Sequence, residues 1–320
     1  MDAIKGLPRA KRSGVTPDPE PRYVHLLAEA WAAERGDNKP TALGTPYRHS
    51  DAGKCARYLS YVAAGIPASD PMDLTGVWTT GMGTLLHEHW QTEMAARYPD
   101  AEMEVKVATD GADGSGHIDA VIRTGGRVVA YELKTCGGYA YKGAVGAMSR
   151  GKAAEGPKPE HLIQAALNGV GVDADEVVIG YLAREPISPG VAHRFGLPDN
   201  ERFCAEWTYT RDQFTTVAAD EARRVSGILA LVEGGELARR VIPFTTPPGA
   251  EITDPSEGRW ELFDADGNTV EAGLHWAEGQ GCWGYCRFAG ACTQLPSGRI
   301  PVADAQAVAV EMGLLPKEAA

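Results

Sequence analysis

The sequence has no apolar run that approaches the ~20 residues needed for a membrane-spanning helix. Its N-terminus also lacks the apolar core of a secretory signal peptide, so we expect a cytoplasmic protein. Hydrophobic residues make up 43% of the 320 residues, a content typical of a globular protein rather than a disordered one. The length suits one large domain or two small ones, with a sizeable core.

Positive charge is scarce as well. The chain has 31 Lys and Arg against 43 Asp and Glu, which gives a formal net charge of −12. This balance argues against a broad nucleic-acid-binding surface, although a local basic patch would still allow docking. It predicts weak non-specific affinity for nucleic acid and strong sensitivity to salt.

Cysteine is infrequent and unevenly spread. The six cysteines are Cys55, Cys136, Cys204, Cys282, Cys286 and Cys292. In a cytosolic protein, clustered cysteines indicate metal binding rather than disulfides. Four thiolates suit either zinc or an iron–sulfur cluster, and spacing alone does not choose between them. We interpret Cys136 and Cys204 as ordinary buried or half-buried thiols.

Residues 116–135 have the pattern of a β-hairpin. Two β-rich runs flank Gly125 and Gly126, and a Gly-Gly pair is a favoured two-residue turn because glycine tolerates positive φ. With this turn Thr124 faces Arg127, and the pairing of the residues further out along both strands follows.

This pairing places Asp119 directly opposite Glu132 and puts Lys134 on the same face of the sheet. Opposed carboxylates repel each other, and a divalent cation would remove the repulsion. Mg²⁺ typically takes one or two carboxylates together with waters and substrate phosphates. The alternative is a solvated polar face on which Lys134 offsets the charge, and spacing alone leaves both interpretations open.

The Gly-x-x-Asp sequence that ends at Asp119, followed by the Glu-x-Lys that begins at Glu132, resembles the core motif of PD-(D/E)XK nucleases. Helix-like stretches lie on either side, with His87 upstream and Gln164 downstream. One cysteine lies far upstream and three lie near the C-terminus. This order is similar to that of RecB-like exonucleases with an iron–sulfur cluster, including CRISPR-associated and phage relatives. The resemblance covers roughly residues 46–295.

The resemblance implies an α/β fold, a restriction-endonuclease-like core with a mixed central sheet flanked by helices. It implies that Mg²⁺ or Mn²⁺ is held by His87, Asp119, Glu132 and the Leu133 carbonyl. Lys134 would orient the attacking water, and Gln164 would complete the catalytic set. Relatives often carry an aromatic residue four positions after this glutamine, where the present chain has Asn168.

The resemblance also implies a 4Fe–4S cluster, with zinc as the alternative. Its ligands would be Cys55, Cys282, Cys286 and Cys292. The cluster would tie the C-terminal segment to an N-terminal helix and so stabilise the fold by closing a long loop. Relatives usually have two residues between the first two cysteines of the C-terminal group, whereas this chain has three.

Residues 136–160 directly follow Lys134 and are rich in glycine. The side chains in this stretch that suit contacts with bases and phosphates are Tyr139, Tyr141, Lys142, Arg150 and Lys152. The alternative is a plain mobile loop. In an acidic chain, so narrow a basic loop favours single-stranded DNA over duplex, which would need a broader positive surface.

Along the chain we expect a flexible basic arm over residues 1–21, a nuclease core over 22–242, and a linker with the iron–sulfur segment over 243–320. Periodicity predicts helices over 22–35, 50–64, 80–98, 161–169 and 212–232, strands over 102–108, 176–184 and 201–209, and a small hairpin around 260–268.

These patterns together predict a metal-dependent DNA exonuclease that prefers single-stranded ends and serves recombination, repair or phage DNA processing. A recombination or single-strand-binding protein would be its partner. The alternatives are a structure-selective or sequence-specific endonuclease of the same fold, and a non-catalytic zinc or iron–sulfur DNA-binding recombination protein.

Overall fold

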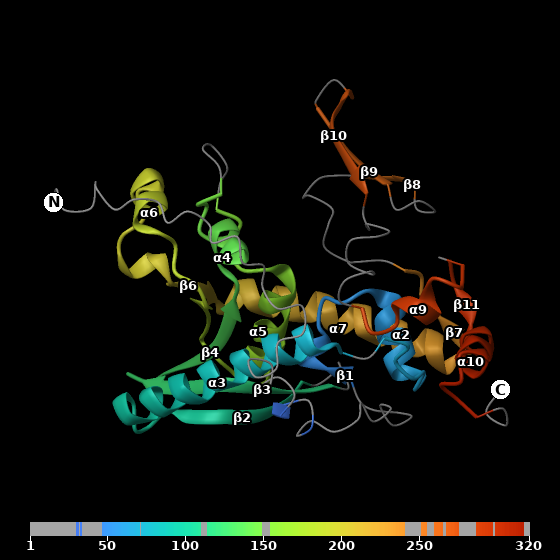
Figure 1. Ribbon diagram of the computed structural model, residues 1–320, viewed down its shortest axis with the longest axis horizontal. Coiled ribbons are helices and arrows are strands. Elements are labelled where there is room, and N and C mark those ends of the chain that lie inside the picture. Colours follow the sequence, from blue (N-terminus) through green and yellow to red (C-terminus); the bar gives the residue numbers. More distant parts are fainter. Residues whose placement is uncertain are drawn as a thin grey trace, which may run out of the picture.

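The computed structural model describes residues 30–31, 33, 47–70, 72–109, 114–148, 154–240, 251–254, 259–264, 267–274, 286–296 and 298–316. A six-stranded mixed sheet forms its centre, with strand order β1-β3-β4-β5-β6 and β2 paired to β3 (Figure 1). The strands are β1 Tyr47–Arg48, β2 Glu102–Thr109, β3 Gly114–Thr124, β4 Arg127–Cys136, β5 Glu176–Ala183 and β6 Cys204–Thr210.

Strands β2, β3 and β4 form the expected antiparallel meander. Gly125 and Gly126 form the turn with φ values of 56° and 78°, a conformation that residues with a side chain rarely adopt. Thr124 pairs with Arg127, as the turn requires, and the ladder continues to the pair of Ala120 and Tyr131. The prediction of the hairpin and its register is confirmed.

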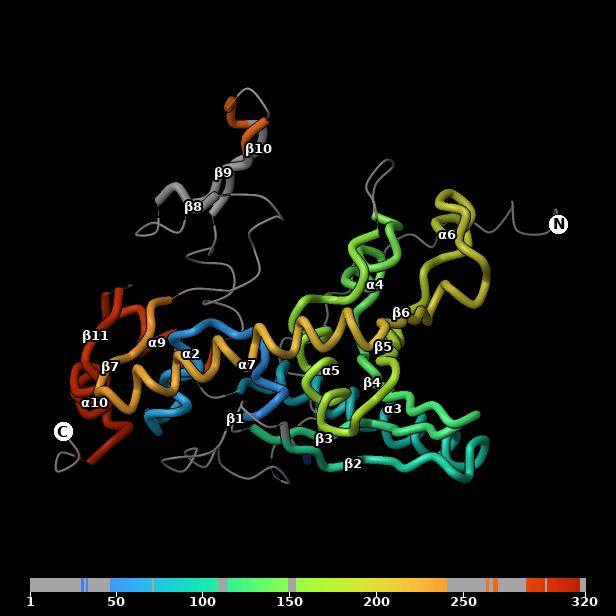
Figure 2. The backbone as a smooth tube through the Cα atoms, turned by 180° about the vertical axis from the view of Figure 1, so that it is seen from behind, coloured from blue at the N-terminus to red at the C-terminus, as the bar shows by residue number. Residues whose placement is uncertain are grey.

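Helices cover both faces of the sheet. The helices of this part of the chain are η1 His49–Asp51, α2 Ala56–Ala63, α3 Leu74–Arg97, α4 Gly138–Ala144, α5 Pro159–Gly171, α6 Pro189–Phe195, η2 Asn200–Arg202 and α7 Arg211–Glu233. Helix α3 lies on one face, and α5 and α7 lie on the other, as the two opposite views show (Figures 1 and 2).

Successive side chains of β4 contact these two layers, as the period of a strand requires. Tyr131 stacks on Trp90 of α3, with ring centroids 4.9 Å apart, whereas Glu132 accepts hydrogen bonds from α5. Gly169 lets α5 approach β5 closely, because a Cβ at this position would lie 2.4 Å from Cγ2 of Val177. The mixed α/β prediction, with a central sheet between helices, is therefore confirmed.

Two helices begin at capped positions. Helix α3 starts at Leu74, earlier than the periodicity predicts, because the Asp73 side chain accepts a hydrogen bond from the Gly76 amide at 2.7 Å. Helix α7 starts with a capping box formed by Thr210 and Gln213. Neither helix, nor any other within the described ranges, is long and apolar enough to cross a membrane.

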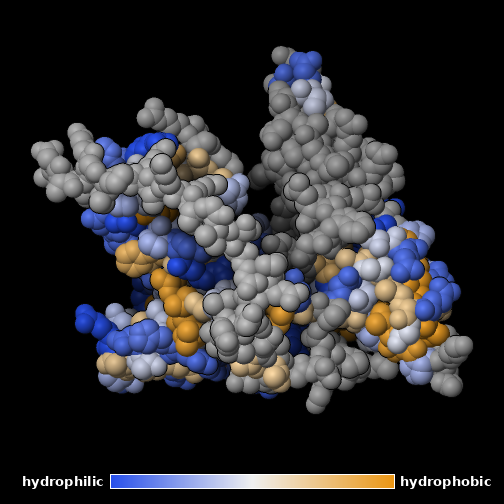
Figure 3. All heavy atoms as spheres, viewed as in Figure 1, coloured by the Kyte–Doolittle hydropathy of each residue, from blue (hydrophilic) through white to orange (hydrophobic). Residues whose placement is uncertain are grey.

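The C-terminal elements pack beside α2. They are β7 Glu236–Leu237, α9 Ala289–Cys292, β11 Ile300–Pro301 and α10 Val302–Glu311. Strands β7 and β11 pair antiparallel, and the fully buried Arg57 of α2 donates hydrogen bonds to the carbonyls of Ala238 and Gly298. Figure 3 shows hydrophobic residues gathered over α10 and its neighbours on this face. The C-terminal part is thus joined to α2 by backbone and side-chain contacts.

Two expectations about regions without regular structure are wrong. The stretch 136–160 contains helix α4, which begins two residues after the end of β4. The linker expected at the start of 243–320 contains strand β8 Glu251–Asp254, which pairs with β9 Arg259–Phe263. The predicted hairpin around 260–268 is confirmed, since β9 pairs with β10 Thr269–Leu274. The arm 1–21 lies outside the described residues, and the division into domains stays a prediction.

Candidate metal-dependent active site

The predicted catalytic residues gather where β3 and β4 separate. The ladder between these strands is regular up to Ala120 and Tyr131, and continuing it by one residue brings Asp119 opposite Glu132. Here the Leu133 amide of β4 donates to a side chain of β3 and not to its backbone, since Oδ2 of Asp119 accepts this hydrogen bond at 2.7 Å. The separation of the strands leaves a carboxylate at the end of the ladder.

Asp119 is also reached from the opposite layer. The Nδ1 atom of His87 in α3 lies 3.3 Å from its Oδ1 atom. Asp119 is only 8% exposed, so a carboxylate in this position needs such polar neighbours. The structure therefore places His87 beside Asp119, the arrangement that the sequence predicts for two ligands of one ion.

Glu132 is buried and held by three donors. Its Oε1 accepts hydrogen bonds from Nζ of Lys134 and from Nε2 of Gln164, both at 2.7 Å, and its Oε2 accepts one from Nδ2 of Asn168 at 3.1 Å. Burial raises the pKa of the Glu132 carboxyl, Lys134 acts in the opposite direction, and the Asp119 charge raises it further. A cation beside both carboxylates would relieve these unfavourable contributions.

Lys134 and Gln164 contact each other as well as Glu132. The Lys134 Nζ donates to Oε1 of Gln164 at 2.9 Å, so its ammonium group lies between the glutamate and the glutamine. The structure thus joins Lys134 of β4 and Gln164 of α5, which lie 30 residues apart in the sequence, in one hydrogen-bond network.

Sequence reasoning missed two members of this network, Asn168 and His49. Asn168 appeared only as a departure from the expected aromatic residue, yet its amide contacts Glu132 directly. Its spacing of four from Gln164 on a helix was a signal that both side chains face the same strand. No pattern in the sequence pointed to His49, which lies 119 residues before Asn168 and reaches it only in the folded chain.

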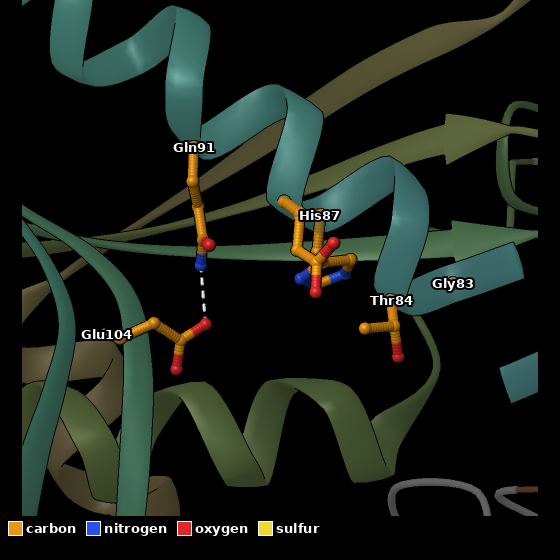
Figure 4. Close-up of a pocket in the computed structure, with 6 residues that line it drawn as sticks. Gly83, Thr84, His87, Gln91 and Glu104 are labelled. Carbon is orange, nitrogen blue, oxygen red and sulfur yellow. Dashed lines mark hydrogen bonds between the residues drawn. The ribbon is translucent and has the colours of Figure 1, made fainter. Parts of the chain in front are cut away.

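A recess of about 450 Å³ adjoins His87 (Figure 4). It is lined by Gly83, Thr84, His87, Glu88, Gln91 and Glu104. The Gln91 side chain donates to Oε1 of Glu104 at 2.5 Å, and Glu104 has a positive φ of 52° in strand β2. His87 therefore contacts both this acidic recess and Asp119.

The donor types of the site fit a small, hard cation. Carboxylate oxygens suit Mg²⁺ and Mn²⁺, and a neutral imidazole such as that of His87 is a common metal ligand in proteins. Within the described ranges, no three His, Cys, Asp or Glu side chains already converge on one point. The reason is visible in the contacts, because Glu132 is held by donors of β4 and α5, whereas Asp119 is held by groups of β4 and α3.

Three of the four predicted cluster cysteines lie in the described part of the chain. Cys55 precedes the first turn of α2 as its N-cap, and Cys286 and Cys292 lie at and near α9. Burial raises the pKa of the Cys292 thiol, and Cys55 is close enough to raise it further. All three pack on the hydrophobic core. Cys282 lies outside the described residues, so the proposed set of four stays a prediction.

The predicted DNA-contacting residues divide into two groups. Tyr139 is 77% exposed at the start of α4 and Lys142 is half-buried, so both side chains are open to a ligand. Tyr141 is fully buried and its hydroxyl donates to the Glu201 carbonyl at 2.9 Å, so the expectation that its ring stacks on bases is wrong. Residues two apart on a helix face different sides, which explains the difference. Arg150 and Lys152 lie outside the described residues.

Neither a family model nor a curated protein matches this sequence. Among solved structures, the alkaline exonuclease LHK-Exo from Laribacter hongkongensis is 17% identical, with a TM-score of 0.36, and the match covers 64% of this chain and 93% of that one. Its complex with dAMP gives 18% identity, the same coverage and a TM-score of 0.34. A phage-related exonuclease from Haemophilus somnus 129PT is 12% identical, with a TM-score of 0.33, over 48% of this chain and 72% of that one.

Proposed function

We propose that this protein is a divalent-metal-dependent DNA nuclease, and that it acts as an exonuclease on single-stranded ends. The observation that carries the proposal is the contact of Lys134 with the buried Glu132, at 2.7 Å, beside a second buried carboxylate at the point where two strands separate. Phosphodiester hydrolysis needs a cation site and a positive side chain next to it, and this arrangement supplies both.

Each residue of the site has a distinct task in this proposal. Asp119, Glu132, the Leu133 carbonyl and His87 would hold Mg²⁺ or Mn²⁺, which when bound polarises a phosphate oxygen and lowers the pKa of a coordinated water. Lys134 orients the attacking water and offsets the charge that builds up on the phosphate. Gln164 keeps the Lys134 ammonium group in place through its hydrogen bond. The cleaved product would carry a 5′-phosphate.

The preference for single strands is supported by the exposed ring of Tyr139 and the nearby Lys142. An exposed aromatic ring beside a positive charge suits a flexible strand whose bases can stack on it. The acidic balance of the chain argues against a second, broad positive surface for a duplex.

The cysteine region has a structural task in this proposal. Cys55, Cys282, Cys286 and Cys292 would hold a 4Fe–4S cluster, with zinc as the alternative metal. The support for a shared ligand set is that Phe288, the N-cap residue of α9, packs on Tyr58 and Tyr61 of α2. The cluster would hold α9 against α2 and would not touch the substrate.

A substrate panel tests the proposal. End-labelled linear single strands, circular single strands and blunt duplexes are incubated with Mg²⁺, with Mn²⁺ or with a chelator. We expect metal-dependent loss of the linear single strand, slower loss of the duplex, and intact circles. Cut circles would indicate the endonuclease alternative, and DNA binding without cleavage in either metal would indicate the binding-protein alternative.

A further inference from the structure

Asn168 lies between Glu132 and a fully buried histidine. Its Nδ2 donates to Oε2 of Glu132 at 3.1 Å and to the His117 carbonyl at 2.9 Å, and its Oδ1 lies 2.7 Å from Nδ1 of His49. Asn168 is 1% exposed and His49 is 0% exposed. Both polar atoms of the Asn168 amide and Nδ1 of His49 are therefore paired, whereas Nε2 of His49 is buried without a hydrogen-bond partner among the described residues.

The orientation of the Asn168 amide follows from its partners. A carboxylate and a backbone carbonyl both accept hydrogen bonds, so the group facing Glu132 and His117 is the NH₂. The Asn168 oxygen therefore faces His49, and Nδ1 of His49 carries the proton that it donates. Burial lowers the pKa of His49, which agrees with a neutral ring in this tautomer.

The hydrogen bonds of Glu132 leave one direction open. An ionised carboxylate has about four acceptor positions, two on each oxygen. Lys134 and Gln164 occupy both positions on Oε1, and Asn168 occupies one on Oε2. Among the described contacts, the acceptor position that remains is on Oε2, the oxygen that Asn168 contacts.

We propose that Asn168, held by His49, is the positioning residue that directs the free lone pair of Glu132 Oε2 toward the catalytic cation. This inference rests on the proposed function. His49 acts only through Asn168, and Asn168 acts only through Glu132, so neither is a catalytic residue. In this proposal Oε1 of Glu132 holds Lys134 and Gln164, which orient the attacking water. Its Oε2 accepts from Asn168 and would bind the metal.

Gly116 gives independent support for this role. A Cβ at this position would lie 2.4 Å from Oδ1 of Asn168 and 2.6 Å from Nδ1 of His49. Both contacts are closer than real Cβ atoms approach, so a side chain here would displace one partner. The backbone of β3 is thus shaped to accept the Asn168–His49 pair.

The test measures the affinity of the full chain for Mn²⁺ by calorimetry, without DNA. Groups that orient a metal ligand typically change metal affinity by about 10–100-fold when removed. We expect Asn168→Ala to weaken Mn²⁺ binding within that range, and Gly116→Ala to do so through displacement of the same pair. His49→Phe should act in the same direction, and His49→Gln, which retains an N–H donor, should restore part of the affinity.

Leu167→Ala is the matched control. Leu167 is the neighbouring residue of α5 and is also fully buried, but its side chain is apolar, so truncation loosens packing without removing a hydrogen-bond donor. We expect this variant to lose thermal stability and to bind Mn²⁺ like the wild type. Its cleavage rate at saturating Mn²⁺ should also stay close to that of the wild type.

Three results would overturn the inference, and they differ in what else they overturn. Wild-type Mn²⁺ affinity in folded Asn168→Ala, Gly116→Ala and His49→Phe would remove the positioning role and leave the nuclease proposal standing. Absence of Mn²⁺ binding and of cleavage in the wild type would overturn both proposals together. If Asn168→Ala does not fold, the comparison of His49→Phe with His49→Gln decides, and equal affinity in these two overturns the inference.

Discussion

The contacts that build the candidate active site join residues much closer together in the sequence than the contacts that build the cysteine region. Glu132 takes its hydrogen bonds from partners 2, 32 and 36 residues away. Arg57, beside the cysteines, bonds to carbonyls 181 and 241 residues away, and Asp70 accepts from the Gly290 amide across 220 residues. The site is thus assembled mainly within one stretch of chain, whereas the cysteine region joins two distant ones.

This difference leads us to expect that the proposed cluster, if bound, would stabilise the cysteine region more than a cation would stabilise the site. Closing a long loop costs more conformational entropy than closing a short one, and a metal clip offsets that cost. The site instead contains charged groups that neutralise one another, with Lys134 and Glu132 as the central pair. We therefore expect that changes in the site affect cleavage, and that changes at the cysteines affect folding.

The strongest expected effect is at the carboxylates. Glu132→Ala should abolish cleavage, and Lys134→Ala should reduce its rate by about 10²–10³-fold, the usual effect of losing one group that stabilises developing charge. Cleavage of end-labelled single strands and circular dichroism measure rate and fold in parallel. The exposed Glu102 of β2, which pairs with Arg123 of β3, supplies the control variant Glu102→Ala. A folded Glu132→Ala protein with full activity would contradict the site assignment.

The second prediction concerns the cysteines. Cys55→Ser should lower the free energy of unfolding by on the order of 5 kcal/mol, the entropy of closing a loop of such length. Protein purified without oxygen should absorb broadly near ~400 nm, and the variant should lose this absorbance. Cys204→Ser, outside the proposed set, is the control. If elemental analysis finds stoichiometric zinc and no iron, the four cysteines hold zinc and not a cluster. If Cys55→Ser is as stable as the wild type, the cysteines do not stabilise the fold, and the contrast with the active site fails.

A smaller effect is expected from His161, which lies in the site region on α5. Burial, followed by the charges of Lys134 and Lys158, lowers its pKa from 6.5 to about 3. The unfolded chain therefore binds a proton that the folded chain excludes between these values, so stability falls as pH falls from 6.5 toward 3. The loss amounts to at most about 1.4 kcal/mol per pH unit.

His161→Phe keeps an aromatic ring beside Tyr181, whose ring centroid is 5.5 Å from that of His161. Urea unfolding at several pH values between 4.5 and 6.5 should give a shallower loss of stability in this variant. His193→Phe removes an exposed histidine and serves as the control. Parallel curves for His161→Phe and the wild type would show that another group causes the acid sensitivity.

The smallest effect is expected at α4. Tyr139→Ala should weaken binding of single-stranded DNA by about 1–3 kcal/mol, since a base loses its stacking partner. Tyr141→Phe should leave DNA affinity unchanged, because that ring is buried and only its bond to Glu201 is lost. Fluorescence anisotropy with labelled oligonucleotides in a chelator measures both. An equal loss of DNA affinity in the two variants would mean that Tyr141 contacts DNA as well.

The sequence by itself determined those parts of the protein that depend on interactions between residues close together along the chain. The Gly125–Gly126 turn and the two-residue period of the strands set the register of the hairpin, because both are properties of neighbouring residues. The structure shows this register as far as Ala120 and Tyr131, one residue before Asp119 and Glu132. Helical periodicity likewise predicted α5 and α7 to within a few residues at each end. The two-residue period of the strands placed Lys134 beside Glu132, and the two are in contact. His87 and Gln164 entered through a family resemblance, and their contacts with the two carboxylates agree with it.

Only the tertiary structure decided which distant side chains meet. His49 reaches Asn168 across 119 residues, and the hydroxyl of the buried Tyr141 donates to the carbonyl of Glu201, 60 residues away. Such contacts result from the packing of whole elements, which no local period encodes. The same holds for Phe288, the N-cap residue of α9, which packs on Tyr58 and Tyr61 of α2 more than two hundred residues earlier in the chain.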